Sequence, residues 1–163
     1  GRHGIAILSV REGLTFESAI ESDCGNLAPL VAGLHVAGVE IHCLRDLTRG
    51  GLSAALNEIA LDAGVEITVD ETTVPVEDTV RGACELLGLD PLYVANEGRM
   101  IAIVPAADAE RVLHAWRDHP AAADPAIIGR VAESKRHRVL LTGSLGGTRI
   151  LDLLSGEQLP RIC

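Results

Sequence analysis

Residues 44–52 read LRDLTRGGL, and the rest of the chain is organised around this stretch. Residues 39–44, which lead into it, alternate apolar Val39 and Ile41 with polar neighbours and are typical of a strand. After the two glycines, Leu52, Leu56 and their apolar neighbours recur at the spacing of one helical face. The stretch therefore predicts a strand, a tight glycine turn and a helix in direct succession.

The glycine turn allows two interpretations. Free backbone N–H groups and the positive end of the helix dipole favour an anion at such a junction, and Arg49 adds a forked donor that suits phosphate. Alternatively, Asp46 or Thr48 caps the helix, and the glycines serve only the turn. At this point both a phosphate site and a capped turn stay open.

Apolar patterns on either side predict further strands and helices in one domain, residues 1–154. The expected strands are 5–10, 39–44, 65–69, 100–104, 127–132, 139–142 and 148–151, and the expected helices are 26–37, 52–60, 76–87 and 107–119. Asp90 and Pro91 suit the cap and the first position of another helical turn. Nothing periodic follows Leu154, so 155–163 is predicted to be a flexible tail.

Composition excludes several function classes. A net charge of −9 and only three aromatic side chains argue against nucleic-acid binding, which needs basic surfaces and rings that stack on bases. Hydrophobic residues make up 47% of the chain, yet no apolar run approaches the roughly 20 residues that span a bilayer, so we expect no membrane contact. The excess apolar surface is expected to cover a core and to face a partner.

The four cysteines form no CxxC pair and no spacing typical of zinc, so we expect no metal site. No signal peptide or lipidation motif is present, and a reduced, cytoplasmic protein is the simplest inference. Cys84 lies among the apolar positions of the expected helix 76–87 and is predicted to be a buried, unreactive thiol.

Glu97 lies in the tripeptide Asn96-Glu97-Gly98, in a loop between two apolar segments. A carboxylate in such a loop can lose part of its hydration, which strengthens it as a base. Glu97 is therefore a candidate general base. A solvated loop glutamate without a catalytic role is the alternative.

The chain ends in Pro160-Arg161-Ile162-Cys163, which puts a thiol on its last residue. A thiol at the end of a flexible tail can travel into a site built elsewhere. Its own α-carboxylate disfavours the thiolate, while Arg161 partly offsets that charge. Cys163 is thus either a carrier thiol that a site must activate or the incidental last residue of a disordered end.

Four segments together resemble one family: LRDLTRGGL (44–52), LNEIA (56–60), LGLDPLYVANEG (87–98) and QLPRIC (158–163). They are similar to the C-terminal domain of HypE, the carbamoyl dehydratase of nickel–iron hydrogenase maturation. The first two segments are shared with aminoimidazole ribonucleotide synthetase and selenophosphate synthetase. The PRIC ending is therefore what points to HypE.

The resemblance implies an α+β fold, with a mixed sheet and helices packed on it, like the C-terminal domain of aminoimidazole ribonucleotide synthetase. It implies ATP and magnesium as cofactors of the complete protein, bound mostly by an N-terminal domain. Because the chain opens at Gly1 without Met, we expect that domain to be absent from it. The complete protein is expected to be a homodimer, and this chain alone to be monomeric, inactive and without cofactor.

The resemblance also implies roles for individual residues. Cys163 receives a carbamoyl group from the carbamoyltransferase HypF, and the ATP-dependent reaction converts it to a cyano group for iron on the HypC–HypD complex. Glu97 is implied as the base that removes the amide protons, and Asn96 as a cofactor contact. The implied glycine-turn contacts to the cofactor are Asp46, Thr48, Arg49, Gly50 and Gly51.

Two other functions stay open from the sequence. The chain can be a non-catalytic docking module for hydrogenase maturation partners. It can also belong to another ATP-using enzyme of the same superfamily, in which residues 158–163 would be dispensable for activity.

Overall fold

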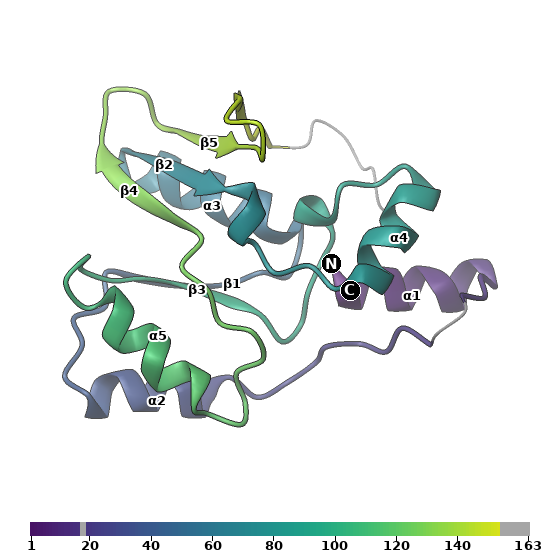
Figure 1. The fold of residues 1–163 in the computed structure, drawn as a ribbon, viewed down its shortest axis with the longest axis horizontal. Helices are drawn as coiled ribbons and strands as arrows, with labels where there is room; N and C mark the ends of the chain where they lie inside the picture. The colour runs from purple at the N-terminus through teal and green to yellow at the C-terminus, as the bar shows by residue number, and fades with distance from the viewer. Residues whose placement is uncertain (17–18, 154–163) are drawn as a thin grey trace.

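The computed structural model describes residues 1–16 and 19–153, and Figure 1 shows their arrangement. The helices among these residues are α1 (Arg2–Glu12), α2 (Ala28–Val36), α3 (Gly51–Ala63), α4 (Asp78–Leu87) and α5 (Ala109–Arg117), with the short 3-10 helices η1 (Glu71–Thr73) and η2 (Pro91–Tyr93). The strands are β1 (Cys43–Asp46), β2 (Val65–Asp70), β3 (Met100–Ile103), β4 (Gly129–Glu133), β5 (Arg138–Thr142) and β6 (Thr148–Ile150).

The described strands form two sheets. In the larger sheet, of order β4-β2-β5-β6, β2 runs antiparallel to β4 and parallel to β5, and β5 runs antiparallel to β6. β1 and β3 form a separate antiparallel pair, in which Asp46 lies opposite Met100. The larger sheet is thus mixed and helices pack on it, which confirms the predicted α+β class.

Helix α3 covers one face of the larger sheet and lies behind β2 in Figure 1. The side chains at this contact are at most 5% exposed: Leu52, Leu56, Ala60, Ile67, Val69, Val139 and Leu141. Full burial of one such Leu, Ile or Val side chain stabilises the fold by about 1.5–3 kcal/mol. The helix that begins at the glycine turn is therefore rigidly attached to the sheet.

Residues 5–10 lie in a helix, so the strand predicted there is wrong. Ile5 and Leu8 are three residues apart on one face of α1 and pack against α4, which lies beside α1 in Figure 1. Gly13, at φ 63°, donates its N–H to the carbonyl of Ser9 and ends the helix. Packing against α4 outweighs the strand preference of the β-branched residues, and a left-handed glycine such as Gly13 is a common helix end.

The strand expected at 39–44 lies later in the chain, at Cys43–Asp46. Val39 instead packs in a small core with Leu34 of α2 and Val112 of α5. Figure 1 shows these two helices side by side. Val39 is apolar because it packs against these two helices, so its apolar side chain does not indicate a strand.

The predicted cap at Asp90 is confirmed. The side chain of Asp90 accepts a hydrogen bond from the N–H of Leu92 at 2.9 Å and caps η2, in which Pro91 is the first residue. A hairpin connects β5 to β6, closed by the N–H of Gly143 donating to the carbonyl of Gly147 at 2.9 Å. Both features depend on contacts between near neighbours in the sequence.

The three described cysteines carry free thiols in different surroundings: Cys24 is exposed, Cys43 half-buried and Cys84 buried. Desolvation by burial raises the pKa of the Cys84 thiol. The prediction of a buried core thiol at Cys84 is confirmed.

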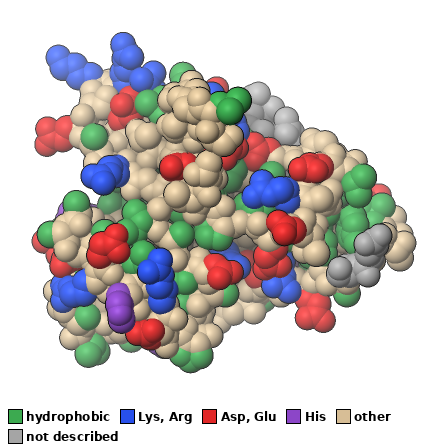
Figure 2. Space-filling view, in the orientation of Figure 1, with side chains coloured by type: hydrophobic (Ala, Val, Ile, Leu, Met, Phe, Trp, Pro, Cys, Tyr) green, Lys and Arg blue, Asp and Glu red, His purple; other side chains and the backbone are tan. Residues whose placement is uncertain are grey.

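The face shown in Figure 2 carries acidic and basic side chains interspersed with apolar ones. Among the described residues, none of the helices combines the length and the apolar character that crossing a membrane requires.

Candidate functional site

The glycine turn links β1 to α3, as predicted. Gly50 is the N-cap of α3 at φ 71°, and no side chain caps the helix, so the alternative of a cap by Asp46 or Thr48 is wrong. Gly51 has φ 59°, and a Cβ atom there would lie 2.6 Å from the carbonyl oxygen of Val94. The close approach that Gly51 permits is therefore made to the chain's own backbone.

Polar side chains stiffen the start of this turn. The carboxylate of Asp46 accepts hydrogen bonds from Arg45 at 2.7 Å and from the hydroxyl of Thr48 at 3.1 Å. Arg45 also donates to Glu58 of α3 at 2.7 Å, and this contact raises the pKa of Arg45. Arg49 lies exposed at the tip of the turn.

The loop that carries Glu97 lies against the glycine turn. The N–H of Asn96 donates to the carbonyl of Leu47 at 3.0 Å, and the N–H of Leu47 donates to the carbonyl of Arg99 at 3.1 Å. The structure thus brings two motifs together that are about fifty positions apart in the sequence.

The side chain of Asn96 is buried at 7% exposure. Its amide nitrogen donates to the carbonyl of Val94 at 3.3 Å, and its amide oxygen accepts from the backbone nitrogen of Gly1 at 2.6 Å. Both ends of the amide are therefore engaged by the chain's own backbone.

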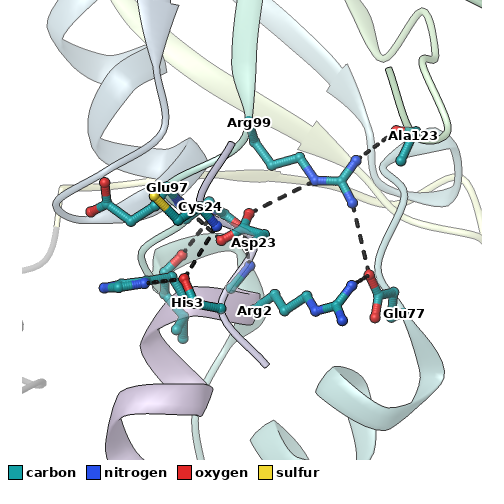
Figure 3. Close-up of polar contacts among 12 residues, drawn as sticks. Arg2, His3, Asp23, Cys24, Glu77, Glu97, Arg99 and Ala123 are labelled. Atoms are coloured by element: carbon teal, nitrogen blue, oxygen red, sulfur yellow. Dashed lines mark hydrogen bonds and ion pairs between the residues drawn. The ribbon is translucent and has the colours of Figure 1, made fainter. Parts of the chain in front are cut away.

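Glu97 itself is half-buried. Its backbone N–H donates to the carboxylate of Asp23 at 3.0 Å. In Figure 3 the carboxyl group of Glu97 points away from Asp23 and Arg99, and the thiol of Cys24 lies beside the Glu97 side chain.

Sequence reasoning missed Asp23 and Arg99, which flank Glu97. The Asp23 side chain is only 7% exposed, and its carboxylate lies 3.9 Å from the Nε atom of Arg99. Residues 21–27 follow neither a helical nor a strand pattern, and Asp23 is 74 positions from Glu97. A charged residue beside Cys24 is the only local signal, and it does not indicate a partner.

Cys163 lies outside the described residues. Residues 151–152, near the end of the described part of the chain, are hydrogen-bonded to α3. The hydroxyl of Ser53, in the first turn of α3, donates to the carbonyl of Asp152 at 2.9 Å. The amide of Asn57 donates to the carbonyl of Leu151 at 2.8 Å. Residues 151–152 are thus attached to the N-terminal half of the helix that begins at the glycine turn.

Within residues 1–16 and 19–153, no group of three or more His, Cys, Asp or Glu side chains is arranged to hold a metal ion. What the described residues assemble is a half-buried carboxylate, an adjoining glycine turn and an exposed arginine at the tip of that turn. This set can accept a proton and face an anion.

Comparisons with known proteins give a consistent result. The family described as "AIR synthase related protein, C-terminal domain" matches residues 1–142. The carbamoyl dehydratase HypE of Azotobacter vinelandii is 55% identical over 163 residues, which are 100% of this chain and 48% of that protein. The chain therefore spans about half the length of this curated relative.

Two solved structures are similar over nearly all of the chain. The crystal structure of the hydrogenase maturation protein HypE in complex with ATP superposes with a TM-score of 0.93 at 45% identity, covering 100% of this chain and 50% of that one. The crystal structure of a HypE–HypF complex superposes with a TM-score of 0.89 at 40% identity, covering 94% of this chain and 50% of that one.

Proposed function

We propose that this chain, which belongs to the AIR synthase related protein C-terminal domain family, is the part of a carbamoyl dehydratase that supplies its acceptor thiol, Cys163, and its general base, Glu97. The complete protein converts S-carbamoyl-Cys163 to S-cyano-Cys163 with ATP and so provides cyanide ligands for the iron of nickel–iron hydrogenase. The observation that carries the proposal is the 55% identity to a carbamoyl dehydratase HypE across all 163 residues, a range that includes both Glu97 and Cys163.

The chemistry follows from the properties of a thiocarbamate. Its carboxamide oxygen is a poor leaving group, so transfer of a phosphoryl group from ATP to that oxygen makes departure feasible. The oxygen then leaves as phosphate, while the nitrogen loses both of its protons and forms the triple bond of the thiocyanate. The products balance as thiocyanate, ADP, phosphate and one proton. A base within hydrogen-bonding reach must accept the amide protons, and Glu97 is proposed for that role.

The point at which the chain leaves the sheet supports the delivery of Cys163 to Glu97. The carbonyl of Asp152 is bonded to Ser53, close to the glycine turn that the Glu97 loop adjoins. Cys163 comes eleven positions after Asp152, and an extended segment of that length reaches about 35–40 Å. Holding the thiol and the base together is then an orientation task.

The described residues fit only part of a nucleotide site. Arg49 is exposed at the tip of the turn and suits a phosphate, with Thr48 beside it. Gly51 and the amide of Asn96, however, are occupied by contacts to the chain's own backbone. We therefore place most of the binding of ATP and magnesium in residues outside this chain, with Asp46, Thr48 and Arg49 facing the phosphates or the domain interface.

The partners belong to the same proposal. The structure of a HypE–HypF complex, which resembles this chain at 40% identity, supports HypF as the donor of the carbamoyl group. The HypC–HypD complex is proposed as the acceptor of the cyano group, and the complete protein as a cytoplasmic homodimer. The free thiols of the three described cysteines fit a reduced location.

Mass spectrometry of the complete protein tests the proposal. After incubation with the carbamoyltransferase, carbamoyl phosphate and ATP, we expect a carbamoyl adduct and then a cyano adduct on the peptide that contains Cys163. The thiols of Cys24, Cys43 and Cys84 serve as internal controls. Modification at one of those cysteines instead, or at none, would overturn the assignment.

A further inference from the structure

Asp23 holds a buried carboxylate whose two oxygens have different surroundings. Oδ1 accepts the backbone N–H of Glu97 at 3.0 Å. Oδ2 is buried and has no hydrogen-bond partner within the described ranges. Burying a carboxylate is costly unless opposite charge and hydrogen bonds compensate it. The guanidinium of Arg99, whose Nε atom lies 3.9 Å from Oδ2, provides an opposite charge.

The segment that carries Asp23 is anchored to the first turn of α1. The Nε atom of Arg2 donates to the carbonyl of Glu21 at 2.8 Å, and the His3 ring shares a hydrogen bond of 2.8 Å with the hydroxyl of Ser22. Figure 3 shows the side chain of Arg2 extending from α1 toward Glu77. The segment from which Asp23 contacts Glu97 is therefore held in place by α1.

Arg99 is held on the opposite side by two other parts of the chain. It donates to the carbonyl of Ala123 at 2.6 Å and lies 3.8 Å from Glu77, which is also paired with Arg2 at 3.0 Å. Figure 3 shows this sequence of contacts running from Asp23 through Arg99 to Glu77. The cation that offsets the charge of Asp23 is thus itself restrained.

Gly98 leaves the loop no room to move toward Asp23. A Cβ atom at this position would collide with the carbonyl oxygen of Asp23. The backbone of residues 97–98 is therefore packed directly on residue 23. The N–H of Glu97 is hydrogen-bonded to the Asp23 carboxylate, and Gly98 packs against the Asp23 carbonyl.

We infer that Asp23 is a positioning residue for the reaction: through the backbone N–H of Glu97, it holds the loop so that the Glu97 carboxyl group meets the amide protons of the substrate. This inference rests on the proposed function. Asp23 touches neither substrate nor reacting atoms in this role. Displacing a catalytic group by about 1 Å can slow a reaction on the order of 100-fold, which is enough to make such a contact matter.

The test uses the complete protein, carbamoylated at Cys163 beforehand, in a single turnover with ATP followed by mass spectrometry. For Asp23→Ala we expect the rate of cyano formation to fall about 10- to 100-fold. The KM for ATP and the rate of carbamoylation by the transferase should stay within about twofold, because the contact acts only on the base. For Asp23→Asn, which keeps an oxygen acceptor for the Glu97 N–H, we expect most of the rate to return.

Asp70→Ala is the matched control. Asp70 also accepts a backbone N–H, that of Thr72 at 2.9 Å, but at the end of β2, where it lies opposite Thr142 of β5. This variant should form the cyano adduct at the wild-type rate. The inference is overturned if Asp23→Ala keeps the wild-type rate, if Asp70→Ala slows as much, or if Asp23→Asn recovers nothing.

A second variant covers the case in which Asp23→Ala does not fold. Asp23→Glu keeps the charge but displaces the carboxylate by one carbon–carbon bond, and we expect at least a 10-fold lower rate with an unchanged KM for ATP. Cyano formation at the wild-type rate in that variant also overturns the inference. If the wild-type protein itself forms no cyano adduct, the proposed function fails instead, so the two failures are distinguishable.

Discussion

Glu97 donates its backbone N–H to Asp23 at 3.0 Å, so part of what holds its loop does not involve the carboxyl group. Replacing Glu97 with Gln therefore keeps the loop contact and the side-chain size but removes the proposed base. In the complete protein we expect cyano formation to slow on the order of 10²- to 10⁴-fold, with the carbamoyl form of Cys163 accumulating. Mass spectrometry over a time course measures both species. Cyano formation at the normal rate in this variant would remove Glu97 from the proposed role.

Asp70 provides a pH-dependent contribution to stability. Hydrogen bonds from the hydroxyl and the N–H of Thr72, at 2.6 and 2.9 Å, lower the pKa of its carboxyl group. Because the folded state holds this proton less tightly than the unfolded state, the contribution is present above the ordinary pKa and is lost as pH falls through the lowered one.

We therefore expect Asp70→Ala to lower the urea midpoint at pH 7, and the difference from wild type to shrink when the measurement is repeated below about pH 4. Equilibrium unfolding of both proteins at the two pH values measures this. A difference of the same size at both values would mean that the charge of Asp70 contributes nothing and that only local packing is lost.

Two glycines in helices form a matched pair that separates a required glycine from a replaceable one. At Gly51, the first residue of α3, a Cβ would lie 2.6 Å from the carbonyl oxygen of Val94, at a φ of 59°. At Gly82, inside α4, a Cβ would meet nothing within 4 Å. The close contact between α3 and residues 92–94 requires glycine at position 51, whereas no contact requires glycine at position 82.

We expect Gly51→Ala to destabilise the fold by about 2 kcal/mol or more, since it combines a left-handed backbone with a steric clash. Gly82→Ala should stabilise it by about 0.5–1 kcal/mol, because alanine loses less backbone entropy in a helix. Urea unfolding of the two variants against wild type measures both changes. Equal effects of the two substitutions would show that the turn does not need its second glycine.

The buried core of the described residues lies between Ile5 and Leu151. Deleting residues 158–163 therefore removes the proposed acceptor thiol without removing any of these core side chains. In the complete protein we expect the thermal midpoint to change by no more than about 2 °C, while both the carbamoyl and the cyano adducts disappear. Calorimetry and mass spectrometry of the same preparation measure the two outcomes. Retained activity would favour another ATP-using enzyme of the superfamily.

Local sequence determined much of this protein. The glycine turn and helix of residues 50–60, the Asp90 cap and the burial of Cys84 were all predictable. Each of them depends on side-chain periodicity, on backbone angles that favour glycine, or on a hydrogen bond between near neighbours. The motifs that carry Glu97 and Cys163 could also be recognised, because they are short and contiguous.

Tertiary structure alone decided the remainder. Whether 5–10 is a strand or a helix depends on the face that α4 offers to Ile5 and Leu8, and no local pattern encodes that face. Asp23 and Glu97 meet across 74 positions because the anchoring of residues 21–22 to α1 brings the carboxylate to the loop. Long-range hydrogen bonds of this kind depend on how whole helices and strands pack together. The proposed base could therefore be identified from its sequence motif, whereas the residue that positions it could not.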